Sequence, residues 1–328
     1  MPSIKVAILG FGTVGEGIYR ILNERKEEIQ KETGHTIDIV SILVRDTSKE
    51  RLVTPGITIT NDIQEILSNP DIDVIFEAIV GEEPAYSYLT TAIDKGCHVI
   101  TANKTMFAKH GPTLVAHAES RGVQARYEAT TAGGVPVIRT ITSLLPADRV
   151  RRIRGILNGT SNFILTKMRE EEVSFEVALK EAQVLGYAEV DPTDDIGGKD
   201  AFRKLMILSA LSFGSQPDWQ EVPIVGIDGV TTEDVKDASA GNLRYRHVAD
   251  ISADDNGVLR GSVGPVLISA DHPLYGVDGV DNAIIVDTDH LGSLTLIGPG
   301  AGMYPTGSAM VGDFLQIIGK REPAVITS

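Results

Sequence analysis

A single cysteine, Cys97, occurs in the 328-residue sequence, so no disulfide can form within the chain. It lies in the apolar run Cys97–Ile100, where we expect a buried thiol with a structural role. No stretch approaches the roughly 18 consecutive apolar residues that a membrane-spanning helix requires. The first residues lead directly into the apolar run Ile4–Leu9, without the pattern of a secretory signal peptide. These absences predict a soluble, cytoplasmic protein with no membrane partner.

Basic residues are also scarce, because 30 Lys and Arg stand against 45 Asp and Glu, a formal net charge of -15. Binding to nucleic acid needs clustered basic side chains, so the balance argues against a nucleic-acid partner. The seven histidines are scattered without the spacing of transition-metal ligands. The hydrophobic fraction of 42% is ordinary for a globular protein. The function must therefore be sought in the motifs.

The first third of the chain alternates short apolar runs with helical patterns. Strands are expected at Lys5–Leu9, Ile37–Val44, Val74–Ile79, His98–Thr101 and Gln124–Glu128. Such alternation is typical of βαβ units, whose right-handed crossovers build a parallel sheet. We therefore predict an α/β fold that starts with a Rossmann-type, doubly wound parallel sheet.

The pattern changes at about Gly134. A helix at Val135–Leu145 and a strand at Arg149–Leu157 precede a mainly helical stretch, which ends with a helix at Lys199–Phe213. Further strands are expected at Leu243–Ile251, Val258–Ile268, Ala283–Asp287 and Leu294–Ile297, before a last helix at Ser308–Ile318. Turns rich in Gly, Asp and Asn separate these strands, which favours an antiparallel sheet with helices on one side. The second part is therefore predicted to be an α+β domain.

A glycine motif points to a dinucleotide. Gly10-Phe11-Gly12-Thr13-Val14-Gly15 matches GxGxxG, follows the first strand and opens a helix. Its glycines permit a tight turn and a close approach of the pyrophosphate to the helix N-terminus. The alternative is an ordinary glycine turn, which the position after the first strand disfavours.

The residue that distinguishes NAD from NADP is expected at the end of the second strand. There the sequence has Arg45-Asp46. A guanidinium can hold the 2′-phosphate of NADP, whereas a carboxylate can accept a hydrogen bond from the free 2′-hydroxyl of NAD. Arg45 favours NADP, Asp46 keeps NAD open, and a solvated pair without a ligand is the remaining alternative.

Several stretches beyond this motif follow one another in a fixed order. They are Thr101–Lys104, Tyr127–Pro136, Gly155–Asn162, Gly186–Pro192, Asp195–Lys204 and Gly298–Gly302 with Pro305-Thr306. Together they resemble homoserine dehydrogenases, and the resemblance runs across essentially the whole chain. It implies reversible reduction of L-aspartate 4-semialdehyde to L-homoserine with NAD(P)H, a step toward threonine, isoleucine and methionine.

The resemblance also implies a division into domains. A dinucleotide-binding domain would span residues 1–133, completed by a C-terminal helix at 306–328. Residues 134–305 would form the substrate-binding domain, which also makes a homodimer. Many relatives carry a C-terminal regulatory domain, whereas this sequence ends at Ser328, so we expect a short form without feedback inhibition through such a domain.

Asp200 and Lys204 stand four residues apart at the polar start of an apolar helix. From spacing alone, a surface ion pair of small energetic value is the simpler interpretation, and the same spacing places Lys199 and Arg203 on a solvated face. The resemblance assigns another role: Lys204 donates a proton to the aldehyde oxygen, and Asp200 holds the substrate hydroxyl and orients the lysine. Such a group is needed because hydride addition develops an alkoxide.

Other roles rest on the resemblance alone. Glu189 would bind the substrate amino group, and Lys104, just beyond a strand end, would be a second active-site lysine that contacts cofactor or substrate. Further substrate contacts are implied at Asp195, Tyr187, Gly186 and Thr160, and a cofactor contact at Gly302. A solvated strand-end lysine is the alternative for Lys104.

A monovalent cation site is implied in the same way. The carboxylate of Glu128 and the backbone carbonyls of Thr131, Gly133 and Val135 would hold sodium, because hard cations prefer oxygen ligands. A plain glycine turn between the domains is the alternative. Two other functions stay open for the chain: a related two-domain Rossmann dehydrogenase for another amino acid or semialdehyde, and a non-catalytic NAD(P)-binding sensor.

Overall fold

The computed structural model describes residues 2–319. The chain folds into two compact units: unit 1 comprises Met1–Thr130 and Gly302–Ser328, and unit 2 comprises Thr131–Ala301. Residues 320–328 of the predicted C-terminal helix lie outside the described residues. Within residues 2–319, no helix combines the length and the apolar character needed to cross a membrane.

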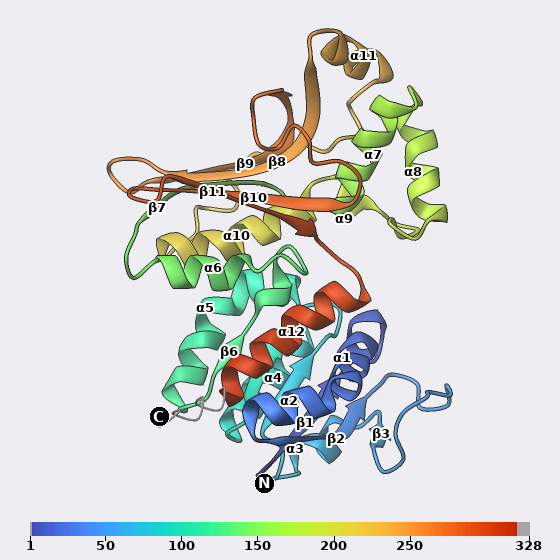
Figure 1. Ribbon diagram of the computed structural model, residues 1–328, viewed down its shortest axis with the longest axis vertical. Helices are drawn as coiled ribbons and strands as arrows, with labels where there is room; N and C mark the ends of the chain where they lie inside the picture. Colours follow the sequence, from blue (N-terminus) through green and yellow to red (C-terminus); the bar gives the residue numbers. More distant parts are fainter. Residues whose placement is uncertain (1, 320–328) are drawn as a thin grey trace, which may run out of the picture. The chain divides into compact units, whose positions relative to one another are not determined.

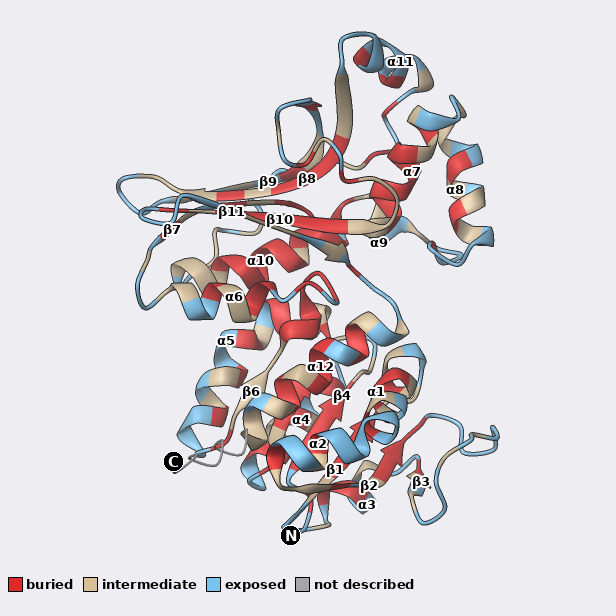
Figure 2. Ribbon diagram, viewed as in Figure 1, coloured by how far each residue is buried: buried red, intermediate tan, exposed pale blue. Residues whose placement is uncertain are grey.

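Unit 1 contains a parallel six-stranded sheet with the order β3-β2-β1-β4-β5-β6 (Figure 1). The strands are β1 (Ser3–Leu9), β2 (Thr36–Leu43), β3 (Thr58–Thr60), β4 (Val74–Glu77), β5 (His98–Thr101) and β6 (Ala125–Arg126). This is the order of a dinucleotide-binding sheet. The whole of β4 is buried, because helices cover both faces of the sheet (Figure 2). The predicted Rossmann-type fold is confirmed.

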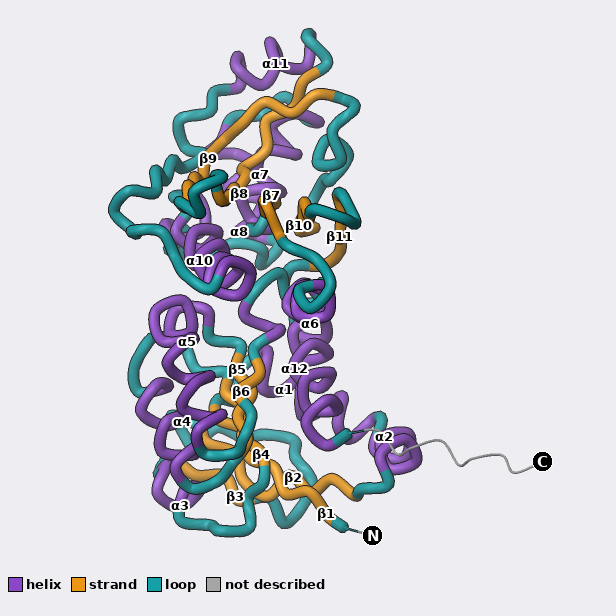
Figure 3. The backbone as a smooth tube through the Cα atoms, turned by 90° about the vertical axis from the view of Figure 1, so that its left-hand side faces the viewer, coloured by secondary structure: helices purple, strands orange, loops and turns teal. Residues whose placement is uncertain are grey.

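Helices cover the two faces of this sheet in separate groups. They are α1 (Thr13–Glu24), α2 (Lys26–Thr33), α3 (Ile63–Leu67), α4 (Ala85–Asp94), α5 (Lys104–Ser120) and α12 (Met303–Ile318). Figure 3 shows α3, α4 and α5 on one side of the sheet and α1, α2 and α12 on the other. The last helix packs closely on the first, because a Cβ at Gly17 would lie 2.3 Å from the Met303 carbonyl oxygen. Chain segments from both ends therefore build one core.

Three details of unit 1 differ from the sequence-based prediction. The strand predicted at Gln124–Glu128 is shorter, and a 3-10 turn follows at Glu128–Thr130. The short strand β3 was not predicted at all. The last helix begins at Met303 rather than at Ser308, with Pro305 in its first turn. Proline is tolerated there because the first amides of a helix need no partner within the helix.

Unit 2 contains an antiparallel five-stranded sheet with the order β11-β10-β7-β8-β9. The strands are β7 (Val150–Ile156), β8 (Leu243–Ala253), β9 (Leu259–Ser269), β10 (Asp281–Thr288) and β11 (Ser293–Pro299). The helices are α6 (Val137–Leu144), α7 (Gly159–Glu170), α8 (Phe175–Val184), α9 (Thr193–Ile196), α10 (Lys199–Phe213) and α11 (Thr232–Ala240). Helix α10 packs against β7, β8 and β9, as Figure 1 shows. The predicted α+β architecture of this part is confirmed.

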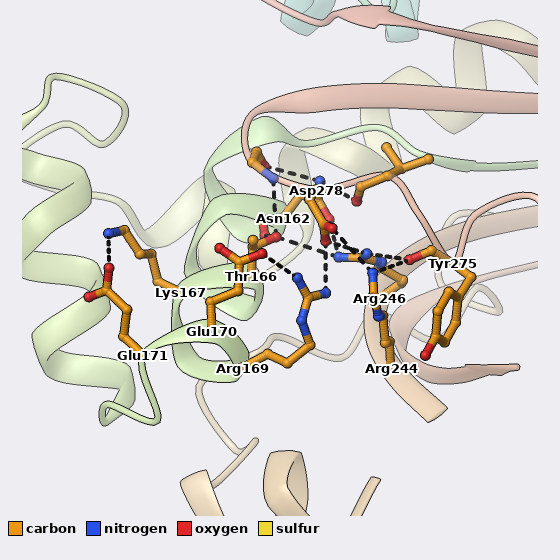
Figure 4. A network of polar contacts seen from close by, with 12 residues as sticks. Asn162, Thr166, Lys167, Arg169, Glu170, Glu171, Arg244, Arg246, Tyr275 and Asp278 are labelled. Atoms are coloured by element: carbon orange, nitrogen blue, oxygen red, sulfur yellow. Dashed lines mark hydrogen bonds and ion pairs between the residues drawn. The ribbon is translucent and has the colours of Figure 1, made fainter. Parts of the chain in front are cut away.

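A buried polar network anchors α7 in unit 2 (Figure 4). The side chain of Arg246 is fully buried and donates to Asp278 Oδ1 at 2.6 Å. Arg169 of α7 donates to the same oxygen at 2.7 Å. The Asn162 amide donates to the carbonyls of Val277 at 3.1 Å and Gly279 at 3.0 Å. Such a network is rigid when its members are satisfied, so the loop before β10 is fixed on α7.

Candidate active site

The first two turns of α10 carry a buried ion pair in unit 2. Lys204 Nζ lies 2.8 Å from Asp200 Oδ2, and the side chains are only 9% and 4% exposed. The surface ion pair expected from spacing alone is therefore wrong, because the apolar helix buries this end as well. By contrast, Lys199 is exposed, and Arg203 pairs with Asp194. Of the four charged residues, only Asp200 and Lys204 form a desolvated pair.

The end of β7 holds both members of this pair. Lys204 Nζ donates to the carbonyl oxygen of Leu157 at 2.6 Å. The next side chain, Asn158, uses its amide nitrogen to donate to Asp200 Oδ2 at 2.8 Å and to Asp195 Oδ1 at 2.7 Å. One amide thus bridges two carboxylates and keeps the lysine and its partner in a fixed geometry.

Asn158 lies in one of the family-like stretches, but the sequence alone indicated no role for it. Its Oδ1 accepts from the Ser161 N–H at 2.8 Å and caps α7. The capping role could have been predicted, because Asn before a helix is a preferred N-cap. The bridge between Asp195 and Asp200 could not, because those residues lie 37 and 42 positions further along the chain.

The residues predicted to contact substrate gather around the first turn of α7. Thr160 Oγ1 donates to the Tyr187 carbonyl oxygen at 2.6 Å, and Ser161 Oγ donates to the Asp195 carbonyl oxygen at 2.9 Å. The Tyr187 ring packs against Phe163 with 5.0 Å between centroids. Gly186 precedes Tyr187 with a positive φ of 78°. Tyr187 is thus anchored on α7, and Asp195 is linked to Asp200 through the Asn158 amide.

Glu189 occupies a different setting. It is exposed on the loop between α8 and α9, and Gln183 Nε2 donates to its backbone carbonyl oxygen at 3.2 Å. The structure holds its backbone through this contact and leaves the carboxylate at the surface of unit 2.

His247 is a second residue that sequence reasoning missed. It is 1% exposed, and its Nε2 lies 3.0 Å from the Val225 carbonyl oxygen. Burial lowers the pKa of this imidazole, so the ring is neutral at pH 7. Gly198 precedes α10 with φ +84°, and a Cβ there would lie 3.2 Å from the His247 ring. Glycine thus lets α10 begin directly against the histidine.

The glycine loop of unit 1 has the geometry that a pyrophosphate needs. Gly10 has φ +92°, and a Cβ there would lie 2.6 Å from the Ala78 carbonyl oxygen. A Cβ at Gly15 would lie 2.0 Å from the Gly10 carbonyl oxygen, whereas one at Gly12 would meet nothing within 4 Å. Gly12 is the N-cap of α1 and has no side chain to bond the first amides. The helix N-terminus is therefore available to an anion, and these residues fit a dinucleotide.

Other predicted cofactor residues also lie in unit 1. Arg45 is exposed just after β2. The adjacent Asp46 accepts from Ser48 Oγ and N–H at 2.6 and 2.9 Å, which lowers the pKa of its carboxyl. Gly302, with φ +116°, is the N-cap of α12. Lys104 is the first residue of α5, which Asn103 caps by accepting from the Met106 N–H at 3.0 Å.

The residues predicted to hold sodium divide between the units. Glu128 belongs to unit 1, is 2% exposed, and donates its backbone N–H to Asp313 Oδ2 at 2.8 Å. Thr131, Gly133 and Val135 belong to unit 2. Gly133 has φ +51°, and a Cβ there would lie 2.4 Å from the Gly300 carbonyl oxygen. Within the described part of the chain, no three His, Cys, Asp or Glu side chains are grouped as metal ligands.

Comparisons with known proteins match this arrangement along both units. A family model described as the NAD binding domain of homoserine dehydrogenase matches residues 10–128, and the homoserine dehydrogenase model matches residues 136–315. The chain belongs to the homoserine dehydrogenase family. The homoserine dehydrogenase of Pseudomonas aeruginosa is 41% identical over 319 residues, which cover 97% of this chain and 73% of that protein.

Solved structures of homoserine dehydrogenases share the fold. That from Thiobacillus denitrificans has a TM-score of 0.92 at 40% identity, and the match covers 97% of this chain and 74% of the other. A hyperthermophilic archaeal homoserine dehydrogenase, solved in complex with NADPH, has a TM-score of 0.83 at 29% identity, with 96% and 97% covered. The shared region thus spans about three quarters of the bacterial chains and nearly all of the archaeal one.

The family membership settles the activity. The enzyme is an NAD(P)-dependent oxidoreductase that interconverts L-aspartate 4-semialdehyde and L-homoserine. In the reductive direction, a hydride adds to the aldehyde carbon and a proton adds to its oxygen. The predicted activity is confirmed, and neither the alternative dehydrogenase nor the non-catalytic sensor is supported.

Proposed function

We propose that Lys204 is the proton donor to the aldehyde oxygen of aspartate 4-semialdehyde, and that Asp200 holds the substrate hydroxyl and orients this lysine. The nicotinamide of the bound cofactor supplies or accepts the hydride. The observation that carries the proposal is the buried Asp200–Lys204 pair with its support from Leu157 and Asn158. A donor fixed in a desolvated site stabilises a developing alkoxide far better than one in water does. The turnover of the Lys204→Ala enzyme tests this role.

Substrate recognition is proposed to come from the loops around α7 and α9. Glu189 would bind the substrate ammonium group, with further contacts from Asp195, Tyr187, Gly186 and Thr160. The hydrogen bonds of Thr160 and Ser161 support this, because they hold the Tyr187 and Asp195 backbones on the first turn of α7, which the Asp200 partner Asn158 caps. Preorganised loops reduce the entropy that binding must overcome.

Lys104 is proposed as a second active-site lysine, in contact with cofactor or substrate. It begins α5 just after the carboxyl end of β5, and ligands of open α/β sheets bind at these strand ends. The remaining cofactor contacts would come from Gly10 to Gly15, from Arg45 and from Gly302.

We also propose that unit 1 is the dinucleotide-binding domain and that unit 2 binds substrate.

We propose that the enzyme prefers NADP, because the exposed Arg45 guanidinium can pair with the 2′-phosphate, whereas Ser48 already engages the Asp46 carboxylate. The NADPH complex of the archaeal relative is in line with this preference. Arg45→Ala should raise the KM for NADP about tenfold, the order of one charged hydrogen bond, and leave the KM for NAD nearly unchanged. Steady-state homoserine oxidation with each cofactor measures this; equal effects on both KM values would contradict it.

Sodium is proposed as a bound ion, held by the Glu128 carboxylate and the backbone carbonyls of Thr131, Gly133 and Val135. Glu128 is 2% exposed, and a buried carboxylate needs polar or cationic partners, among which a bound sodium ion would be one. Replacing sodium with choline in the assay should lower the homoserine oxidation rate, and re-addition should restore it. An unchanged rate after exhaustive dialysis would argue against a functional ion.

A homodimer through the sheet of unit 2 is also proposed. Val225, Val266 and Leu267 are 55%, 41% and 47% exposed, and they line a hollow of about 520 Å³ on this sheet. Neighbouring exposed apolar side chains are typical of protein–protein interaction surfaces. Sedimentation velocity should give a dimer, and a monomer at micromolar concentration would contradict the proposal.

We also propose that the enzyme is cytoplasmic and that it acts in threonine, isoleucine and methionine biosynthesis.

A further inference from the structure

Glu77 is a fully buried carboxyl to which the proposed function gives no part. It ends β4, is 0% exposed, and pairs in register with Thr101 at the end of β5. Its Oε1 accepts from the Ile79 N–H at 2.6 Å, and its Oε2 accepts from the Thr101 hydroxyl. Burying a carboxyl at the end of an inner strand of an apolar sheet costs free energy unless its oxygens accept hydrogen bonds. Oε2 thus joins the ends of β4 and β5, and Oε1 fixes the loop that follows β4.

The hydrogen bonds continue from Thr101 to the start of α5. Thr101 Oγ1 accepts from the Asn103 N–H at 2.9 Å. The Asn103 side-chain amide donates to the carbonyls of Ile79 at 3.0 Å and Gly81 at 2.6 Å. Because Asn103 also caps α5, it connects the loop after β4 with the helix that begins at Lys104. Glu77, Thr101, Asn103 and Ile79 thus form a closed circuit beneath these segments.

We propose that Glu77 is a positioning residue for the reaction: through Thr101 and Asn103, its carboxyl holds Lys104 and the backbone of residues 79–81 in place. This inference rests on the active-site role proposed above for Lys104. A carboxylate suits the position because both of its oxygens accept hydrogen bonds. A glutamine amide would direct N–H groups at the Thr101 hydroxyl and change the direction of that bond.

All donors in the circuit are neutral amides or a hydroxyl, and the hydrogen bonds within residues 2–319 give the Glu77 carboxylate no cationic partner. The desolvation cost of a charged Glu77 is therefore only partly offset. Burial is the main influence and raises the pKa of Glu77 to about 7, although hydrogen bonds from Thr101, Ile79 and Asn103 act in the opposite direction. The carboxyl therefore changes its charge near neutral pH. Protonation should disturb the circuit in the way that glutamine does.

Charged groups on the surrounding elements lie elsewhere or have other partners. The register pairs Glu77 with Leu9 of β1 and Thr101 of β5, the last residues of these strands. Lys5 and His98 lie near the beginnings of the same strands, away from Glu77. Asp94 of α4 pairs with α5, and Asp313 of α12 accepts the Glu128 N–H. Lys104 itself follows Asn103 on α5. None of these groups is among the influences on the Glu77 pKa.

Glu77→Gln tests the ionisation first, without any cofactor. The folded pKa lies above the unfolded value, so the protonated acid stabilises the fold at low pH, and this contribution is lost as pH rises through about 7. The Tm of Glu77→Gln relative to wild type should therefore rise between pH 5 and pH 8. Glu65→Gln, an exposed change on α3, should show a Tm difference that does not vary with pH. A pH-independent difference for Glu77→Gln would show that its carboxyl does not titrate in this range and would overturn the change of charge near pH 7 on which the inference depends.

A double-mutant cycle with Lys104→Ala tests the positioning role. At pH 8, Glu77→Gln should lower kcat about tenfold, since small displacements of reacting groups are costly, and the kcat component that titrates near pH 7 should disappear. In the Lys104→Ala background, the same change should have almost no effect on kcat. If Lys104→Ala lowers kcat and Glu77→Gln lowers it a further tenfold in that background, Glu77 does not act through Lys104. That result would overturn the positioning role and leave the role of Lys104 intact. Wild-type kcat in Lys104→Ala would overturn the role of Lys104 and, with it, this inference.

Discussion

Lys204→Ala is expected to lower kcat for homoserine oxidation about a thousandfold, within the range for loss of a general acid or base. The ammonium is held by Asp200 at 2.8 Å and by the Leu157 carbonyl at 2.6 Å, so the native enzyme keeps this donor in one position, and alanine removes it. The NADPH dissociation constant should change little, because the glycine loop belongs to the other unit. Steady-state kinetics and a fluorescence titration with NADPH measure the two quantities.

The control for this prediction is Lys199→Ala, which removes an exposed lysine from the start of α10 and should leave kcat unchanged. Removing Lys204 also leaves Asp200 buried without its cation, which costs about 3–5 kcal/mol of stability. A thermal melt by circular dichroism must therefore confirm that the variant is folded at the assay temperature. Substantial turnover by folded Lys204→Ala enzyme would remove this lysine from the mechanism.

Gly15→Ala is expected to weaken NADPH binding about a hundredfold and to lower the Tm. A Cβ at this position would lie 2.0 Å from the Gly10 carbonyl oxygen, so the loop and the start of α1 must separate. The amides proposed to bind the pyrophosphate would then move out of position, and each lost charged hydrogen bond costs about 1.5–3 kcal/mol. Fluorescence titration gives the affinity, and differential scanning calorimetry gives the Tm.

Gly12→Ala separates the two effects, because a Cβ there meets nothing within 4 Å in the protein itself. It should leave the Tm unchanged and still weaken NADPH binding, since the pyrophosphate approaches at this residue. Gly229→Ala, which also has open space around its Cβ, should alter neither property. Normal NADPH affinity in Gly15→Ala would refute the assignment of the glycine loop.

Much of the fold could be predicted because local patterns and global packing agree. The strand at His98–Thr101 and the helix at Lys199–Phe213 have the predicted bounds. In both, apolar runs of characteristic length are bounded by polar or glycine residues. The prediction was poorer where packing decides the local structure, as at Glu128–Thr130, which continues a strand-like run but forms a 3-10 turn. There the backbone N–H of Glu128 bonds to Asp313, 185 residues away.

The candidate site divides in the same way. Spacing placed Asp200 and Lys204 on one helical face, but it favoured the surface ion pair that the structure contradicts. Burial of the pair depends on how α10 packs on the sheet of unit 2, which no local pattern encodes. The supporting residues Asn158 and His247 were missed for the same reason, since their partners are remote in the sequence.

The sequence by itself determined the class of the fold, the position of the glycine loop and the family, because each of these depends on residue types at short, regular spacing. Only the tertiary structure decided which charged groups are desolvated and which neutral groups hold them. Asn158 meets Asp200 across 42 residues, and Thr101 meets Glu77 across 24. Desolvation and hydrogen bonding depend on the final packing of segments that the chain order keeps apart.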